Sequence, residues 1–164
     1  MMKNDDTLRE QLLVLLEGKG AHASFDQAVE DFPRDSIGVR PDGFAHSAWQ
    51  LVEHIRIALW DLVEYSRKED HISPEWPSEY WPEDESPPSP SAWGESLEAY
   101  RHWLAEMKGL VADPAVDLTA PLRWNESASL LREVLLAADH SAYHVGQIID
   151  LRRALGCWPA AGAS

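Results

Sequence analysis

Apolar residues recur three or four positions apart in four stretches of the chain, and segments rich in Pro, Gly and charged residues separate these stretches. This period is typical of helices that bury one face. The stretches predict helices over about residues 6–32, 46–68, 89–113 and 125–155. No stretch has a convincing strand pattern. The sequence therefore predicts an all-α fold, a four-helix bundle, in a single domain that spans residues 1–164.

Capping residues place the ends of these helices. An acidic cap at Asp5 or Asp6 suits the start of the first helix, because negative charge is favourable there. Gly18 and Gly20 interrupt its period, so residues 6–32 form one bent helix or two short ones. The other predicted caps are His46 or Ser47, Ser89 followed by Pro90, and Asn125 to Ser129, with Gly156 as the final stop.

Two connections are long. Residues 70–90 are rich in proline and carry Trp76, Tyr80 and Trp81, which would be costly to leave in water. This loop should therefore pack back on the bundle, where it either walls a pocket or only covers the core. Residues 112–126 contain a short extended piece around Leu118, Leu122 and Trp124. Connections of this length allow a crossover topology.

The charge balance narrows the function classes. Acidic residues number 28 and basic residues 14, so the net charge is -14, which disfavours binding to nucleic acids and to anionic membranes. The single cysteine, Cys157, excludes an internal disulfide and indicates a reducing compartment. No signal-peptide pattern opens the chain, and no apolar run reaches the length of a membrane span. We expect a cytoplasmic protein.

Three histidines stand within apolar stripes. His140 and His144 are four residues apart and share one helical face, and His54 belongs to the stripe of the second helix. Ala58 and Ala137 leave space beside them. Two readings fit: neutral histidines hydrogen-bonded in the core, or three ligands of one divalent cation with a fourth position left open. Zinc suits imidazole ligands best, while nickel, iron and manganese also accept them.

Other polar residues near these stripes are candidates to orient the imidazoles or to line a pocket. Gln147, one turn beyond His144, is the best candidate for orienting a ring, and Gln50 stands one turn before His54. His46 can reach a pocket mouth or cap its helix, and Trp81 of the 70–90 loop is a second pocket candidate. Glu53 and Asp139 fit either an orienting role or a solvated helix surface.

Two stretches resemble one known family. The run from His46 to His54 (HSAWQLVEH) and the run from Leu130 to Gln147 (LLREVLLAADHSAYHVGQ) are similar to the helix-two and helix-four motifs of the DinB-like (damage-inducible) superfamily, also called YfiT-like metal-dependent hydrolases. The resemblance extends loosely over most of the chain. It implies a four-helix bundle with a crossover connection and a metal triad. Carried over by position, the triad is His54, His140 and His144, with no departure from the motif.

The resemblance implies several functions without choosing among them. Characterised relatives are metal-dependent transferases that use a low-molecular-weight thiol such as bacillithiol, mycothiol or glutathione. In this chain Arg56, Arg152 and Arg153 are available for the carboxylates of such a cofactor. The alternatives are a metal-dependent hydrolase and a non-enzymatic stress protein that binds a metal or a small molecule. We expect a small-molecule substrate and a homodimer. Either a dimer interface or cover by the 70–90 loop explains the surplus tryptophans: Trp49, Trp60, Trp103 and Trp158.

Overall fold

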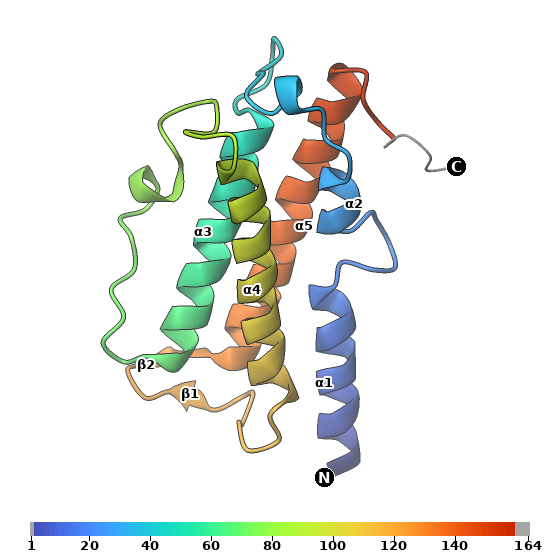
Figure 1. The fold of residues 1–164 in the computed structure, drawn as a ribbon. Coiled ribbons are helices and arrows are strands. Elements are labelled where there is room, and N and C mark those ends of the chain that lie inside the picture. Colours follow the sequence, from blue (N-terminus) through green and yellow to red (C-terminus); the bar gives the residue numbers. More distant parts are fainter. Residues whose placement is uncertain (1, 160–164) are drawn as a thin grey trace.

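Four long helices form the bundle in the computed structural model, which describes residues 2–159, with side chains from residue 5 onward. These helices are α1 (Met2–Leu16), α3 (Ala48–Arg67), α4 (Ala92–Ala112) and α5 (Leu130–Ala154). α1 and α5 run in one direction, and α3 and α4 run in the other (Figure 1). The chain must therefore return along the whole bundle between α3 and α4. The predicted all-α bundle with a crossover connection is confirmed, and 68–91 is the crossing segment.

The first predicted stretch is two helices rather than one bent helix. α1 ends at Leu16, and α2 (Phe25–Val29) follows after a turn in which Gly18 and Gly20 have φ values of 62° and 133°. Such φ values suit glycine and cannot continue a right-handed helix. α1 also begins at Met2, earlier than the predicted start at Asp5 or Asp6, because nothing in residues 2–4 breaks a helix.

Capping geometry fixes the ends of the other helices. Ser47, not His46, caps α3: its hydroxyl accepts from the Gln50 backbone, and the Gln50 side chain accepts from the Ser47 backbone. Ser129 caps α5, whereas Asn125 lies in β2 (Asn125–Ser129), which pairs antiparallel with β1 (Pro121–Leu122). α4 begins at Ala92, two residues after the predicted Pro90, although the Ser89 hydroxyl accepts from the Ala92 backbone as a capping residue does.

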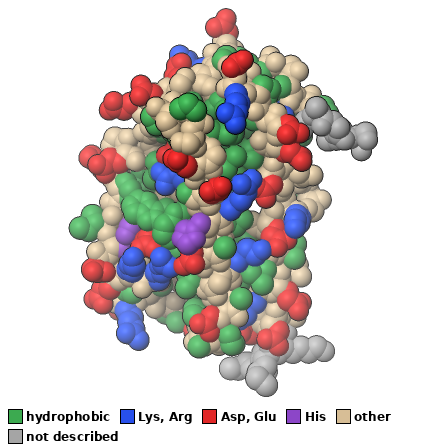
Figure 2. Space-filling view, viewed as in Figure 1, with side chains coloured by type: hydrophobic (Ala, Val, Ile, Leu, Met, Phe, Trp, Pro, Cys, Tyr) green, Lys and Arg blue, Asp and Glu red, His purple; other side chains and the backbone are tan. Residues whose placement is uncertain are grey.

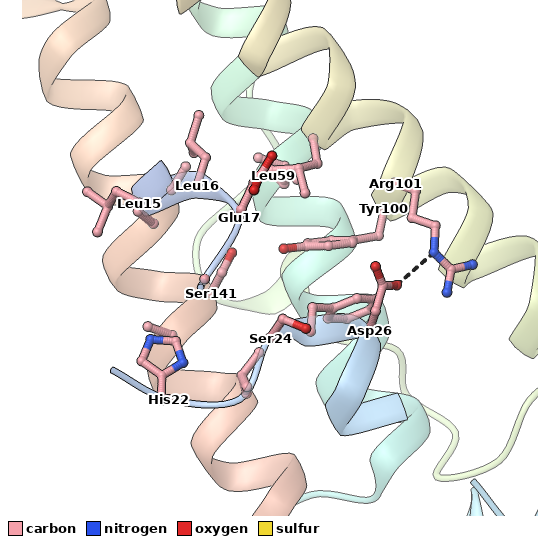
Figure 3. Close-up of a pocket in the computed structure, with 17 residues that line it drawn as sticks. Leu15, Leu16, Glu17, His22, Ser24, Asp26, Leu59, Tyr100, Arg101 and Ser141 are labelled. Atoms are coloured by element: carbon pink, nitrogen blue, oxygen red, sulfur yellow. Dashed lines mark hydrogen bonds and ion pairs between the residues drawn. The ribbon is translucent and has the colours of Figure 1, made fainter. Parts of the chain in front are cut away.

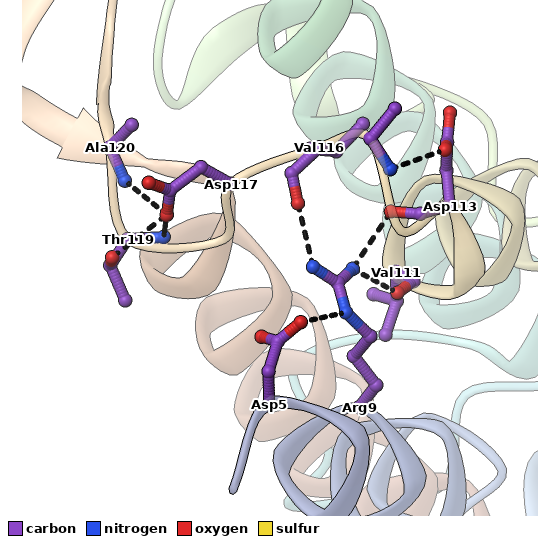
Figure 4. Close-up of polar contacts among 9 residues, drawn as sticks. Asp5, Arg9, Val111, Asp113, Val116, Asp117, Thr119 and Ala120 are labelled. Carbon is purple, nitrogen blue, oxygen red and sulfur yellow. Dashed lines mark hydrogen bonds and ion pairs between the residues drawn. The ribbon is translucent and has the colours of Figure 1, made fainter. Parts of the chain in front are cut away.

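The core lies between the four long helices, which pack as α3 on α4 and α5, and α1 on α4 and α5. Its most buried apolar side chains come from α3, α4 and α5 and include Val52, Ile55, Met107, Val134 and Ile148. A buried cation ties the N-terminal helix to this body. Arg9 donates to the carbonyl oxygens of Val111, Asp113 and Val116 at 2.7, 2.9 and 2.7 Å, so it holds the end of α4 (Figure 4).

The surface carries acidic side chains interspersed with basic ones on the face that shows α4, and a hydrophobic patch beside them (Figure 2). Trp60, Trp103 and the exposed Ile72 line an open groove on the outside of the bundle. Trp49, one of the four tryptophans considered for an interface, is buried and does not reach the surface. The homodimer remains a prediction. Among residues 2–159, no helix combines the length and the apolar character needed to cross a bilayer.

Candidate metal centre

The fold brings His54 of α3 together with His140 and His144 of α5. Their ligand-type ring nitrogens all lie within 4.8 Å of one another, although 86 residues separate His54 from His140. His54 and His144 are buried, and His140 is half-buried. The two stripes face each other because α3 and α5 pack side by side. A group of three imidazoles at this separation can bind one divalent cation.

Hydrogen bonds fix the protonation of two of the rings. His54 Nδ1 lies 2.9 Å from the carbonyl oxygen of Tyr80, and His144 Nδ1 lies 2.7 Å from Oε1 of Gln147. Both oxygens only accept, so each Nδ1 carries the proton and each Nε2 keeps a lone pair. His140 Nε2 lies 2.9 Å from His54 Nε2. The three rings therefore present nitrogens toward a common point, and the tautomers of His54 and His144 leave Nε2 of each ring able to bind a metal.

Burial keeps these histidines neutral. Desolvation lowers the pKa of His54 to about 4, against the raising effect of the Tyr80 carbonyl, and the neighbouring imidazoles lower it further. Desolvation and His144 lower the pKa of His140 to about 4, and desolvation also lowers the pKa of His144. Near neutral pH all three rings are uncharged, which is the form that binds a metal.

The metal-free protein should lose stability as the pH falls from about 6.5 to about 4. In this pH range His54 and His140 bind protons in the unfolded chain but not in the folded protein. Proton binding therefore stabilises the unfolded state and lowers the free energy of unfolding. For His54 the loss between pH 7 and pH 5 should be about 1–2 kcal/mol. Urea denaturation of chelator-treated protein at both pH values measures it.

The matched variants for this measurement are His54→Gln and His102→Ala. The first removes a buried titrating ring, and the second removes an exposed histidine of α4. His54→Gln should narrow the difference in unfolding free energy between pH 7 and pH 5, and His102→Ala should leave it unchanged. If the wild type and both variants showed the same difference in unfolding free energy, the pKa of His54 would be the same in the folded and unfolded protein.

Aromatic rings from the 70–90 loop lie over the histidines. Trp81 stacks on His54 with ring centroids 3.7 Å apart and on His46 at 3.8 Å, so it is held between the two rings. Between ring centroids, Trp76 lies 6.1 Å from His54, and Tyr143 of α5 lies 4.9 Å from His144. Trp76 and Tyr143 are 65% and 64% exposed. The loop thus covers the histidine group, and two exposed aromatic side chains flank it.

Several residues considered from the sequence have other partners. Gln50 does not orient His54: its side chain bonds the Ser47 backbone and the Pro82 carbonyl, as its place in the first turn of α3 dictates. Glu53 is engaged with Arg56 and Ser96. Asp139 is exposed. Gln147, by contrast, lies where an orienting residue was predicted and accepts from His144.

The arginines considered for a thiol cofactor are also engaged. Arg56 pairs with Glu53, and Arg153 pairs with Asp150 on the surface. Arg152 is 1% exposed and donates to backbone carbonyl oxygens of the 28–30 segment and of Cys157. Each of the three arginines therefore already has a partner other than the histidine group.

Sequence reasoning missed a polar cluster next to the site. The Tyr80 hydroxyl donates to Asp61 Oδ2 at 2.6 Å, and His71 Nε2 lies 2.7 Å from Asp61 Oδ1. Asp61 stands seven residues after His54, hence on the same side of α3, and this spacing was the one available signal. The partners in the loop could not be found from spacing.

A separate small cavity is lined by residues of all five helices, α1 to α5. Its walls include Leu59, Ala137, Ser141 and Val145, and the Tyr100 hydroxyl points into it (Figure 3). Its volume of about 70 Å³ is enough to hold water molecules. His54, His140 and His144 are not among its lining residues.

Comparisons with known proteins give one finding. A family model described as the DinB superfamily matches residues 19–148, a range that contains all three histidines together with His46 and Trp81. No curated protein and no solved structure matches the chain.

Proposed function

This chain belongs to the DinB superfamily, as its two helix motifs indicated, and we propose that it is an enzyme that holds one divalent metal ion at His54, His140 and His144. Family membership and the histidine group together support a metal-binding protein. The observation that carries the proposal is the hydrogen bonding of the outer ring nitrogens. Tyr80 and Gln147 occupy Nδ1 of His54 and His144, which leaves Nε2 as the only lone pair that each ring can offer.

The donor set suits zinc first and nickel second. Three neutral imidazoles with an open fourth position are typical of catalytic rather than structural zinc sites. Such an ion lowers the pKa of a thiol or water that binds it, and so supplies a nucleophile near neutral pH. The chain itself positions the rings and excludes water, since Trp81 closes one face of His54.

The reaction we propose is transfer of a low-molecular-weight thiol to an electrophile. The thiol sulfur bonds to the electrophilic carbon, the leaving group departs with its bonding electron pair, and the thiol proton passes to solvent. Trp76 and Tyr143 support an apolar, planar electrophile, because both are exposed aromatic rings next to the histidines. An apolar ligand that covers a large aromatic surface removes it from water, which lowers the free energy.

One observation favours a second candidate, a metal-dependent hydrolase. A thiol cofactor carries carboxylates, and Arg56, Arg152 and Arg153 all have other partners. A hydrolase that acts on a neutral ester or amide needs no such cation.

Two assays of the zinc- or nickel-loaded protein separate these candidates. The first offers 1-chloro-2,4-dinitrobenzene with bacillithiol, mycothiol or glutathione, and the second offers 4-nitrophenyl acetate without a thiol. We expect thiol-dependent loss of chloride that His144→Ala abolishes and His102→Ala leaves intact, because only His144 belongs to the histidine group. Ester turnover without thiol would favour the hydrolase. A bound metal with no turnover in either assay would leave a metal-binding stress protein.

A further inference from the structure

The segment from His71 to Trp81 contacts α3 at two positions along the helix, and Tyr80 takes part in both contacts. Its hydroxyl donates to Asp61 Oδ2 at 2.6 Å, while its carbonyl oxygen accepts from His54 Nδ1 at 2.9 Å. All three residues are buried: His54 is 1% exposed, and Asp61 and Tyr80 are each 7% exposed. One loop residue therefore joins a buried carboxylate to a histidine of the proposed metal centre.

The geometry of α3 makes this bridge specific. Seven residues are almost two full turns, so His54 and Asp61 share one side of the helix about 10 Å apart along its axis. The second oxygen of Asp61 binds the other end of the segment, since His71 Nε2 lies 2.7 Å from Oδ1. The edge of the His71 ring packs against Trp60 at 5.4 Å. A single carboxylate thus holds both ends of the 71–80 segment.

We propose that Asp61 is a positioning residue of the metal centre: it holds Tyr80 so that the Tyr80 carbonyl orients His54, which couples docking of the 71–81 segment to metal binding. This inference rests on the metal site proposed above. The coupling is reciprocal, because a metal that needs the oriented ring also favours the docked segment by the same free energy. Loss of a group that orients a ligating histidine typically weakens metal binding by about 10–100-fold.

The protonation state of the Tyr80 hydroxyl supports its role as the hydrogen-bond donor to Asp61. Burial and the neighbouring Asp61 raise the pKa of its hydroxyl, so it stays protonated and donates to the carboxylate. Trp81, the next residue, stacks on the His54 ring, so displacement of Tyr80 would also move this cover. The competing view is that the segment only covers the core. In that case, loss of the Asp61 contacts would lower stability and leave metal affinity unchanged.

The test compares zinc affinity, measured by competition with a chromogenic chelator, in Tyr80→Phe, Asp61→Asn and Tyr65→Phe. Tyr65 of α3 is the matched control, because its hydroxyl accepts one hydrogen bond, from Asn125 Nδ2 at 2.7 Å, and forms none with the three histidines. We expect zinc to bind about tenfold more weakly to Tyr80→Phe and to Asp61→Asn, and normally to Tyr65→Phe. The visible absorption of bound Co²⁺ should change in the first two variants only.

Hydrogen exchange gives a second readout. The amides of Glu79 and Tyr80 bond to the carbonyl oxygens of Glu75 and Pro77, so their exchange reports on the folded segment. Zinc should slow this exchange in the wild type and in Tyr65→Phe, and should slow it much less in Asp61→Asn. Wild-type zinc affinity in Tyr80→Phe and Asp61→Asn would overturn this inference alone. Absence of zinc binding to the wild type would overturn the proposed function as well.

Discussion

Replacement of His54 by alanine should abolish metal retention. The wild-type protein is expected to hold about one equivalent of a divalent metal, since a single three-histidine group is available among the described residues. His54 supplies one of the three nitrogens, and the two that remain on α5 leave the site with too few ligands. The affinity should fall by more than about a hundredfold, which exceeds the loss expected for an orienting residue. Metal content by mass spectrometry on untagged protein measures this.

His144→Ala should behave in the same way, and His102→Ala should retain the metal. The far-ultraviolet circular dichroism of all three variants should stay helical, because most of the helix packing involves apolar residues elsewhere. Wild-type protein that contains no metal after exposure to zinc and nickel would contradict the prediction. The three imidazoles would then be core residues bonded to Tyr80, to Gln147 and to one another.

Arg152→Ala should destabilise the fold more than any other single change proposed for a charged residue. Arg152 donates to the carbonyl oxygens of Ala28, Glu30 and Cys157 at 2.9, 2.8 and 3.0 Å. Its guanidinium also lies over the rings of Phe32 and Trp158. Removal leaves buried carbonyl oxygens without a donor and frees the turn after α2 from α5. The cost should be roughly 3 kcal/mol or more.

Arg153→Ala is the matched control for this prediction. Arg153 is the next residue, but it and its partner Asp150 are both exposed, so the change should cost less than about 0.5 kcal/mol. Urea denaturation with a chelator present compares the two variants with bound metal excluded from the unfolding free energy. Equal midpoints for both variants would mean that the Arg152 contacts do not stabilise the fold. Arg152→Lys should lie between them, because one ammonium cannot reproduce the guanidinium fork.

The helices and the histidines of the site could be predicted from the amino-acid sequence. Both are local properties. The period of 3.6 residues places His140 and His144 on one face, and it places His54 in the stripe that faces inward. Helix ends were predicted well where a side chain caps the backbone nearby, as at Ser47 and Ser129. The same reasoning found Gln147, which stands three residues after His144.

The tertiary structure alone decided what joins distant parts of the chain. The Tyr80 carbonyl reaches His54 across 26 residues, and the Arg152 guanidinium reaches Ala28 across 124. No periodicity encodes such contacts, because they depend on the path of the 68–91 crossing and on the way α2 packs on α5. For the same reason the sequence indicated only that Arg152 was available for a cofactor, and it indicated no role for Asp61 and His71. Spacing identifies a face, but only the packing of that face determines its partner.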